Sequence, residues 1–215
     1  IPPDSNPYRL AVMANGDALV AVAANNDLLR ITRSGQISTV ARFDTESIST
    51  DQVGDPNLPP TIPAEAVPTS VAVVGRWAYV GELKGFPFRP GSSRVWKVDT
   101  RSNGAVGSVG PAHATRGCRS AMSGFTAIQD LDVNRWTGAT YVYQLAADGV
   151  MAFEEGFNTG QFPPAVLEKV SSGGRRGELV AGQLSQPGGI DVGVFGTVHV
   201  TDGVFGNGRL LQIRG

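Results

Sequence analysis

The sequence predicts an all-β protein, a β-propeller built from four-stranded antiparallel blades, and three observations carry that prediction. Short apolar strands end in a valine at positions 12, 73, 133 and 192, so the motif recurs at steps of 61, 60 and 59 residues. A fixed period of this length is typical of a repeat architecture. Glycine (28 residues) and proline (14 residues) fall between the apolar segments and mark turns. No stretch shows a convincing helical periodicity, because glycine or proline interrupts nearly every window of about a dozen residues.

The first repeat, residues 5–43, contains four short apolar segments separated by tight turns. Polar clusters such as Asn25-Asn26-Asp27 lie between these segments. A meander of segments with period-2 alternation is the usual content of one propeller blade. Because a single blade has an unpaired hydrophobic face, we expect stacking of neighbouring blades to stabilise the fold.

The later repeats, about 66–110, 124–182 and 185–215, are irregular. Residues 44–66 form a connector expected to cover a face of the fold. Residues 101–120 are rich in Gly, Ser and Arg and are interpreted as a mobile loop, and residues 149–164 as an insertion. The last repeat lacks an outer strand, so the ring is either small and irregularly closed or part of a larger one. We favour the second, with residues 1–215 forming one propeller domain or a fragment of a six-bladed propeller.

The composition excludes several classes of function. A net charge of −1 with only 17% charged residues provides no electrostatic basis for binding nucleic acid or an anionic membrane. No apolar run approaches the roughly 18 residues needed to span a bilayer.

A single cysteine, Cys118, excludes an intrachain disulfide and a thiolate zinc site, and an ordinary loop cysteine is favoured over a reactive one. The first residues, Ile1-Pro2-Pro3-Asp4, have neither Met nor a signal-peptide pattern and are interpreted as a mature or truncated start.

Standard catalytic motifs are absent: the chain has no HExxH, no GxSxG and no phosphate-binding loop. The two histidines are His113, in a glycine-rich loop, and His199, within a predicted strand. A Ser-His-Asp arrangement of His199 with the nearby Asp202 stays open. A strand histidine packed against a neighbouring blade is the favoured interpretation.

Asp130 and Asp132 lie two residues apart on a predicted inner strand, so both side chains point to one face. If that face lines the central channel, the pair could bind a divalent cation such as calcium. The alternative is a structural role, in which one carboxylate caps a turn or pairs with an arginine such as Arg135. Asp191 occupies the position equivalent to Asp132, which supports the structural alternative.

A second group of candidates lies at one rim of the predicted channel, where second strands end and inner strands begin. Such rims are common ligand sites because their loops vary on a rigid scaffold. We expect this rim to bind a small molecule, a glycan or a peptide. The candidate rim residues are Asn6, Tyr8, Asn25, Asp27, Glu82, Asp130 and Asp202.

Five segments carry a resemblance to a known family: Ser5–Tyr8, Ala23–Ile31, Val67–Val73, Tyr79–Phe88 with its GFPF ending, and Gln186–Ile190. They resemble the ScyD/ScyE family, propellers related to six-bladed NHL-repeat folds, and the resemblance covers about four blades. It implies an extracellular or periplasmic location, and some family members are associated with scytonemin biosynthesis in cyanobacteria. It implies no catalytic residue set. Val22 departs from the family pattern, which suggests an acidic residue at that position.

Two functions from different classes follow. The favoured one is a non-enzymatic, extracytoplasmic binding or scaffold propeller. The alternative is a metal-dependent propeller hydrolase or lyase, which would require Asp130, Glu82 and Asp202 to converge on a common cation. In either case, a second polypeptide or another copy of the chain is expected to supply the missing blades.

Overall fold

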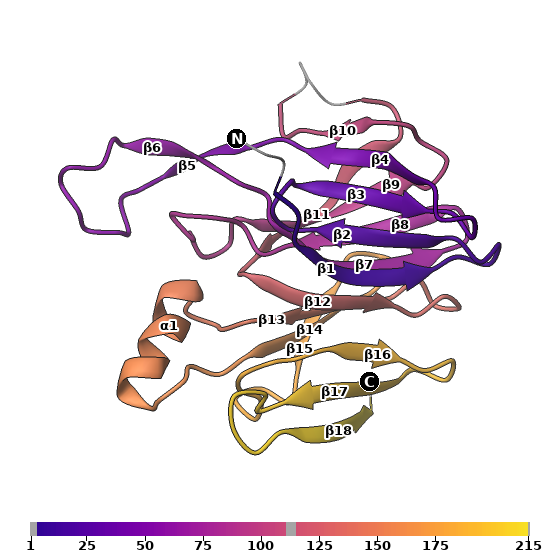
Figure 1. Cartoon of the computed structure of the whole chain (residues 1–215). Coiled ribbons are helices and arrows are strands. Elements are labelled where there is room, and N and C mark those ends of the chain that lie inside the picture. The colour runs from indigo at the N-terminus through magenta and orange to yellow at the C-terminus, as the bar shows by residue number, and fades with distance from the viewer. Residues whose placement is uncertain (1–3, 111–114, 215) are drawn as a thin grey trace.

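The computed structural model describes residues 4–110 and 115–214, and the statements below refer to that part of the chain. His113 lies outside the described residues. The chain folds almost entirely into antiparallel β-sheet, with four sheets stacked in sequence order as blades (Figure 1). The predicted all-β propeller architecture is confirmed.

The first blade is the predicted meander, with one addition. Its antiparallel strands are β1 (Pro7–Val12), β2 (Ala18–Val22), β3 (Asp27–Ile31) and β4 (Ile37–Phe43). The short strand β10 (Ala105–Gly107) pairs with β4 in parallel and extends the outer edge of this blade. A segment of the second repeat therefore ties the first two blades together.

The other three blades follow the predicted period. Each begins at an inner strand that contains one of the repeated valines, and the fourth blade has three strands within residues 115–214. The second blade consists of β7 (Pro68–Val74), β8 (Trp77–Glu82), β9 (Ser93–Asp99) and β11 (Cys118–Phe125); the third of β12 (Ile128–Val133), β13 (Thr140–Gln144), β14 (Val166–Val170) and β15 (Arg176–Leu179); the fourth of β16 (Ile190–Val192), β17 (Thr197–Asp202) and β18 (Arg209–Arg214).

Two expectations about irregular segments were wrong. Residues 101–120 include β10 and the start of β11, because Ala105, Gly107 and Cys118 pack into the core despite their polar neighbours. The insertion after β13 contains a helix, α1 (Val150–Thr159), which buries Val150, Phe153 and Gly156. Gly156, in the second half of this helix, obscures its amphipathic pattern in the sequence. The glycine is needed for packing, because a Cβ atom at this position would lie 2.6 Å from the ring of Phe162.

The connector forms a hairpin of β5 (Glu46–Ser49) and β6 (Thr61–Ala64). In Figure 1 this hairpin and α1 both lie at the left-hand end of the blades, where the second strands end. The short turns between inner and second strands lie at the opposite end. The insertions are therefore gathered at the rim that the sequence singled out.

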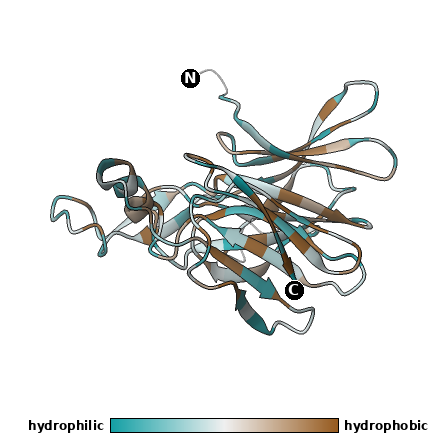
Figure 2. Cartoon of the chain, turned by 90° about the horizontal axis from the view of Figure 1, so that it is seen from below, coloured by the Kyte–Doolittle hydropathy of each residue, from teal (hydrophilic) through white to brown (hydrophobic). Residues whose placement is uncertain are grey.

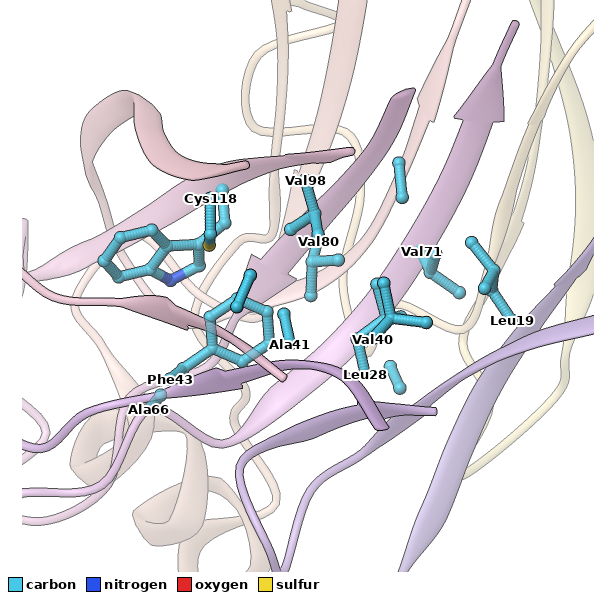
Figure 3. Packing of buried hydrophobic residues seen from close by; sticks show 14 residues of the cluster. Leu19, Leu28, Val40, Ala41, Phe43, Ala66, Val71, Val80, Val98 and Cys118 are labelled. Carbon is cyan, nitrogen blue, oxygen red and sulfur yellow. The ribbon is translucent and has the colours of Figure 1, made fainter. Parts of the chain in front are cut away.

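Apolar contacts between blades form the core. Leu19, Leu28 and Val40 of the first blade pack against Val71 and Val80 of the second (Figure 3). Two further clusters lie between the second and third blades and between the third and fourth. Hydrophobic and hydrophilic residues alternate along the strands (Figure 2), as burial of sheet faces requires. Stacking of blades is thus the main source of apolar burial.

The two ends of the stack differ in chemistry. The outward face of the first blade exposes Tyr8 (45%), Leu10 (60%) and Val12 (68%). The outward face of the fourth blade carries His199 and its cross-strand partner Gln212, with the exposed Leu210. The first and last blades are therefore not packed on each other through these faces.

Candidate functional site

The four inner strands surround a polar channel. Consecutive inner strands pack side by side, β1 on β7, β7 on β12 and β12 on β16. They line a cavity of about 270 Å³ into which Arg9, Asp132 and Asp191 contribute charge. The Arg9 side chain spans the opening between β1 and β16, with Nη2 3.5 Å from the carbonyl oxygen of Ile190. Charged groups therefore concentrate on the axis of the stack.

Asp130 is buried beside this channel and fully engaged. Its Oδ2 accepts a hydrogen bond from the Ile190 amide at 2.9 Å and pairs with the Arg9 guanidinium. Its Oδ1 accepts from the Leu131 amide at 2.9 Å. Burial raises the pKa of Asp130 to about 6, although Arg9 and the two amides favour the charged form.

Asp132, two residues further along β12, also accepts a hydrogen bond from a backbone amide of β16. Its Oδ2 accepts from the Val192 amide at 2.7 Å and its Oδ1 from the Val133 amide at 2.7 Å. Burial again raises the pKa of this carboxyl group. Asp130 and Asp132 together therefore hold the inner strand of the next blade, which is the structural alternative that the equivalent Asp191 suggested.

The candidates on the first blade lie at the end of the blade where β1 and β3 begin. The Tyr8 hydroxyl accepts a hydrogen bond from Nε2 of Gln129 at 2.6 Å, across the channel mouth. Asn6 and Asn25 are exposed, and the Asn6 carbonyl accepts from the Ala23 amide at 2.9 Å. Their role in ligand binding stays a prediction.

Asp27 is buried at the start of β3. Its Oδ1 lies 3.4 Å from Nε of Arg42 but accepts no hydrogen bond from the described residues. Burial raises the pKa of this carboxyl group and outweighs the opposing effect of Arg42. Its role in ligand binding also stays a prediction.

Glu82 lies at the centre of a buried ionic cluster. Its Oε1 is 3.0 Å from Nζ of Lys84 and 3.2 Å from Nε of Arg94, and its Oε2 accepts from Nε1 of Trp96 at 2.9 Å. Glu46 of the β5–β6 hairpin binds both cations. Burial raises the pKa of Glu82, opposed chiefly by Lys84. This carboxylate is inaccessible and anchors the rim hairpin to the second blade.

Asp202 occupies the equivalent end of the second strand in the fourth blade and is also buried. Its Oδ1 accepts from the Tyr143 hydroxyl at 3.0 Å and from the Ser185 amide at 2.7 Å. Its Oδ2 accepts from Nε of Arg209 at 2.9 Å. Asp202 therefore links the fourth blade to the third.

The described residues do not bring the carboxylates together around a cation. Glu82, Asp130 and Asp202 each bind different neighbours, and no three His, Cys, Asp or Glu side chains in residues 4–110 and 115–214 are placed to hold a metal ion. The calcium hypothesis for Asp130 and Asp132 stays a prediction. His199 and Asp202 lie three residues apart on β17, so they point to opposite faces and do not form a dyad.

Sequence reasoning missed Arg9 and Arg94, and it placed Lys84 at the rim without assigning it a partner. The repeat period contained a signal for the first: Arg9 occupies in β1 the position that Asp130 occupies in β12. Opposite charges at equivalent inner positions face each other across a channel. Cys118, predicted in a loop, lies buried in β11, and burial raises the pKa of its thiol to about 12. That thiol is unreactive in the folded state.

The class of protein that this fold defines is the β-propeller. No family model matches the chain, and no curated protein matches it either. Among the described residues, no helix is long and apolar enough to cross a membrane. The similarity is therefore structural.

The chain is similar to solved propeller structures at low sequence identity. It matches a chain of a nidogen/laminin complex with a TM-score of 0.63 at 13% identity, over 99% of this chain and 62% of that one. It matches virginiamycin B lyase from Staphylococcus aureus (TM-score 0.54, 11% identity, 100% and 57% covered). It also matches a putative oxidoreductase (glucose dehydrogenase) from Thermus thermophilus (0.55, 12%, 96% and 61%). The chain spans about six tenths of the length of these neighbours.

Proposed function

We propose that this protein is a partner-binding propeller of the ScyD/ScyE type, located in an extracellular or periplasmic compartment, and that it is not an enzyme. Its partner is a polypeptide that packs an apolar β-sheet face on the first blade. The single observation that carries the proposal is the apolar surface left uncovered on that blade, which we call the blade 1 face: Tyr8, Leu10, Val12, Leu29, Ile31 and Ile37.

The repeat itself identifies what this face fits. Leu10 and Val12 occupy in β1 the positions that Val71 and Val73 occupy in β7. Val71 is buried against the first blade, whereas Leu10 and Val12 are 60% and 68% exposed. An exposed contiguous apolar patch on a β-sheet marks an interaction site. Within this fold, a sheet face of this kind packs against the sheet of a neighbouring blade.

Charge distribution favours a different polypeptide over head-to-tail assembly of identical chains. The opposite end of the stack presents Asp191, His199 and Gln212 to solvent. Packing this polar face on the blade 1 face would bury polar groups without partners, which costs free energy. The resemblance to a nidogen/laminin complex, a binding assembly, is consistent with the proposal.

The alternative of a metal-dependent hydrolase or lyase is less well supported. The lyase neighbours share the fold at 14% identity or less, which carries no site residues to this chain. Four of the carboxylates at the rim and channel, Glu82, Asp130, Asp132 and Asp202, are engaged by amides and cations of the protein itself.

Native mass spectrometry of the natively purified protein tests the proposal, with two variants of matched exposure. We expect a complex larger than the 22.5 kDa chain, lost in Leu10→Glu and retained in Leu210→Glu. Leu210 is 70% exposed at the other end of the stack, so it controls for the charge introduced. Uncomplexed chain in the unmodified protein, or equal loss in both variants, contradicts the proposal.

The location is tested separately, by fractionating cells that produce the complete native protein. Recovery in the extracellular or periplasmic fraction supports an extracytoplasmic protein. Recovery only with cytoplasmic markers contradicts it.

A further inference from the structure

A cleft of about 470 Å³ opens between the third and fourth blades, at the end of the stack opposite α1. It is lined by the β12–β13, β14–β15 and β16–β17 turns and by Tyr141 and Lys169 on the facing strands. The cleft lies away from the blade 1 face, so nothing in the proposed function explains its lining.

Asn134 offers a hydrogen-bond donor at the wall of this cleft. The residue is 3% exposed, and its Oδ1 accepts hydrogen bonds from the amides of Trp136 and Thr137, both at 3.0 Å. Its Nδ2 donates to no acceptor in the described part of the chain and faces the Gly196 turn. An asparagine side-chain amide has two N–H donors, so this one can donate to a molecule that enters the cleft.

Two cations line the same cleft. Nζ of Lys169 lies 5.5 Å from the centroid of the Tyr141 ring, and neither Lys169 nor Arg175 forms an ion pair within residues 4–110 and 115–214. Glu168 and Glu178 lie opposite each other on β14 and β15, and neither lines this cleft, although Glu178 borders an adjoining hollow with Lys169 and Arg175. The cleft therefore presents unneutralised positive charge and no lining carboxylate.

An aromatic ring and hydroxyl groups complete the wall. Phe195, on the β16–β17 turn, is 98% exposed and borders the cleft. Thr137 and Ser171 contribute hydroxyl groups from the two turns of the third blade. The wall therefore places an apolar ring, Phe195, beside several hydrogen-bond donors. Small-molecule sites commonly combine these two features, because the polar groups fix the orientation of the bound ligand.

We propose that this cleft is a second binding site, for a small polyhydroxylated acid of the sugar-acid class. The ligand carboxylate accepts charge-assisted hydrogen bonds from Lys169 and Arg175, and a ring oxygen or hydroxyl accepts from Nδ2 of Asn134. The carbon face of the ligand packs on Phe195. The hydroxyl groups of the ligand exchange hydrogen bonds with Thr137 and Ser171.

The equivalent position between the second and third blades supplies a matched control. Tyr79 pairs with Lys97 there as Tyr141 pairs with Lys169 in the third blade. Nζ of Lys97 lies 4.9 Å from the Trp77 ring and 5.3 Å from the Tyr79 ring, so two aromatic rings already engage it. Lys97→Gln removes the same charge from a site that we do not expect to bind.

Calorimetric titration with glucuronate, glucose and inorganic sulfate tests the proposal. We expect glucuronate to bind, and glucose and sulfate to bind at least about tenfold more weakly, because neither supplies both the charge and the sugar ring. Lys169→Gln and Asn134→Asp should each weaken glucuronate binding by about tenfold or more. Asn134→Asp keeps the oxygen that accepts from the turn amides, and Lys97→Gln should leave binding unchanged.

Each other outcome overturns the proposal. Absence of glucuronate binding removes the site, and sulfate binding as tight as glucuronate binding reduces it to a general anion site. Unchanged binding in Lys169→Gln, in a variant whose melting temperature matches the unmodified protein, places the ligand elsewhere. Because Leu10→Glu does not touch this cleft, glucuronate binding in that variant separates failure of this site from failure of the blade 1 face.

Discussion

Four carboxylates at the rim and channel of this protein form two pairs that are satisfied in different ways. Glu82 and Asp202 end the second strands of their blades and bind cationic side chains, chiefly of their own blades. Asp130 and Asp132 lie on an inner strand and bind backbone amides of the next inner strand. The rim pair therefore secures hairpins and strand ends, whereas the channel pair holds one blade against the next.

The difference follows from geometry. Neighbouring inner strands belong to different sheets, so their amides cannot complete a backbone ladder between blades. A carboxylate that points across the gap accepts from those amides instead, which satisfies buried donors. At the rim, strand ends diverge and long cationic side chains have room to reach a carboxylate. Substitutions should therefore have graded effects.

The largest effect is expected for Glu82→Ala. This change leaves Lys84 and Arg94 buried with only Glu46 to neutralise them. Removing one partner of a buried ionic group should lower the free energy of unfolding by about 3–5 kcal/mol. Chemical denaturation measures this free energy of unfolding. A loss below about 1 kcal/mol would show that Lys84 and Arg94 do not depend on Glu82 for neutralisation.

A smaller effect is expected for Asp202→Asn. The Arg209 side chain is 51% exposed and can be hydrated when its partner loses its charge. Loss of a hydrogen bond to a charged group should lower the free energy of unfolding by about 1.5–3 kcal/mol. If Asp202→Asn proves as costly as Glu82→Ala under the same denaturation conditions, the distinction between buried and half-exposed cations is wrong.

Asp130 should make stability depend on pH. Its folded pKa, about 6, lies above the ordinary value of 3.8, so the folded state binds this proton more tightly. The stabilising contribution is present below about pH 4 and is lost as pH rises through 6, with a slope of at most about 1.4 kcal/mol per pH unit. Other buried carboxyl groups share this sign, so the difference between unmodified protein and Asp130→Asn isolates it. Equal pH profiles would contradict the assignment.

The smallest effect is expected for Asp132→Asn. The asparagine oxygen can still accept from Val192, so only the second bond and the charge are lost. We expect a loss of about 0.5–1.5 kcal/mol. Hydrogen exchange of the Val192 amide should accelerate while amides within β13 keep their protection. Uniform acceleration would show that this carboxylate acts on the whole fold and not on one blade junction.

Much of the fold could be predicted because a propeller repeats one local pattern. The valines at 12, 73, 133 and 192 marked the inner strands, since burial of one sheet face imposes alternation on every copy. The helix α1 and the strands β10 and β11 escaped prediction. Helix α1 and strand β10 occur once each, and β11 is an outer strand within a segment rich in Gly, Ser and Arg. These elements depend on long-range contacts, such as Gly107 beside Cys118 and Trp96.

The candidate site was predictable as a set of residue types and not as an arrangement. The sequence identified Asp130 and Asp132 as carboxylates on an inner strand and Glu82 and Asp202 as residues of the channel rim. Which partner each one meets depends on residues distant in the chain, 121 positions away for Arg9 and Asp130. A period describes one blade at a time, and its information about contacts across the channel is limited to the opposite charges of Arg9 and Asp130 at equivalent positions.

The sequence by itself determined the blade, its strand order and the positions that face neighbouring blades, because alternation and turn chemistry are local properties. Only the tertiary structure decided that the rim carboxylates are buried in ion pairs, that the channel carboxylates join blades, and that a cationic cleft lies between the third and fourth blades. These features require distant residues to meet, and such meetings are set by how the blades stack.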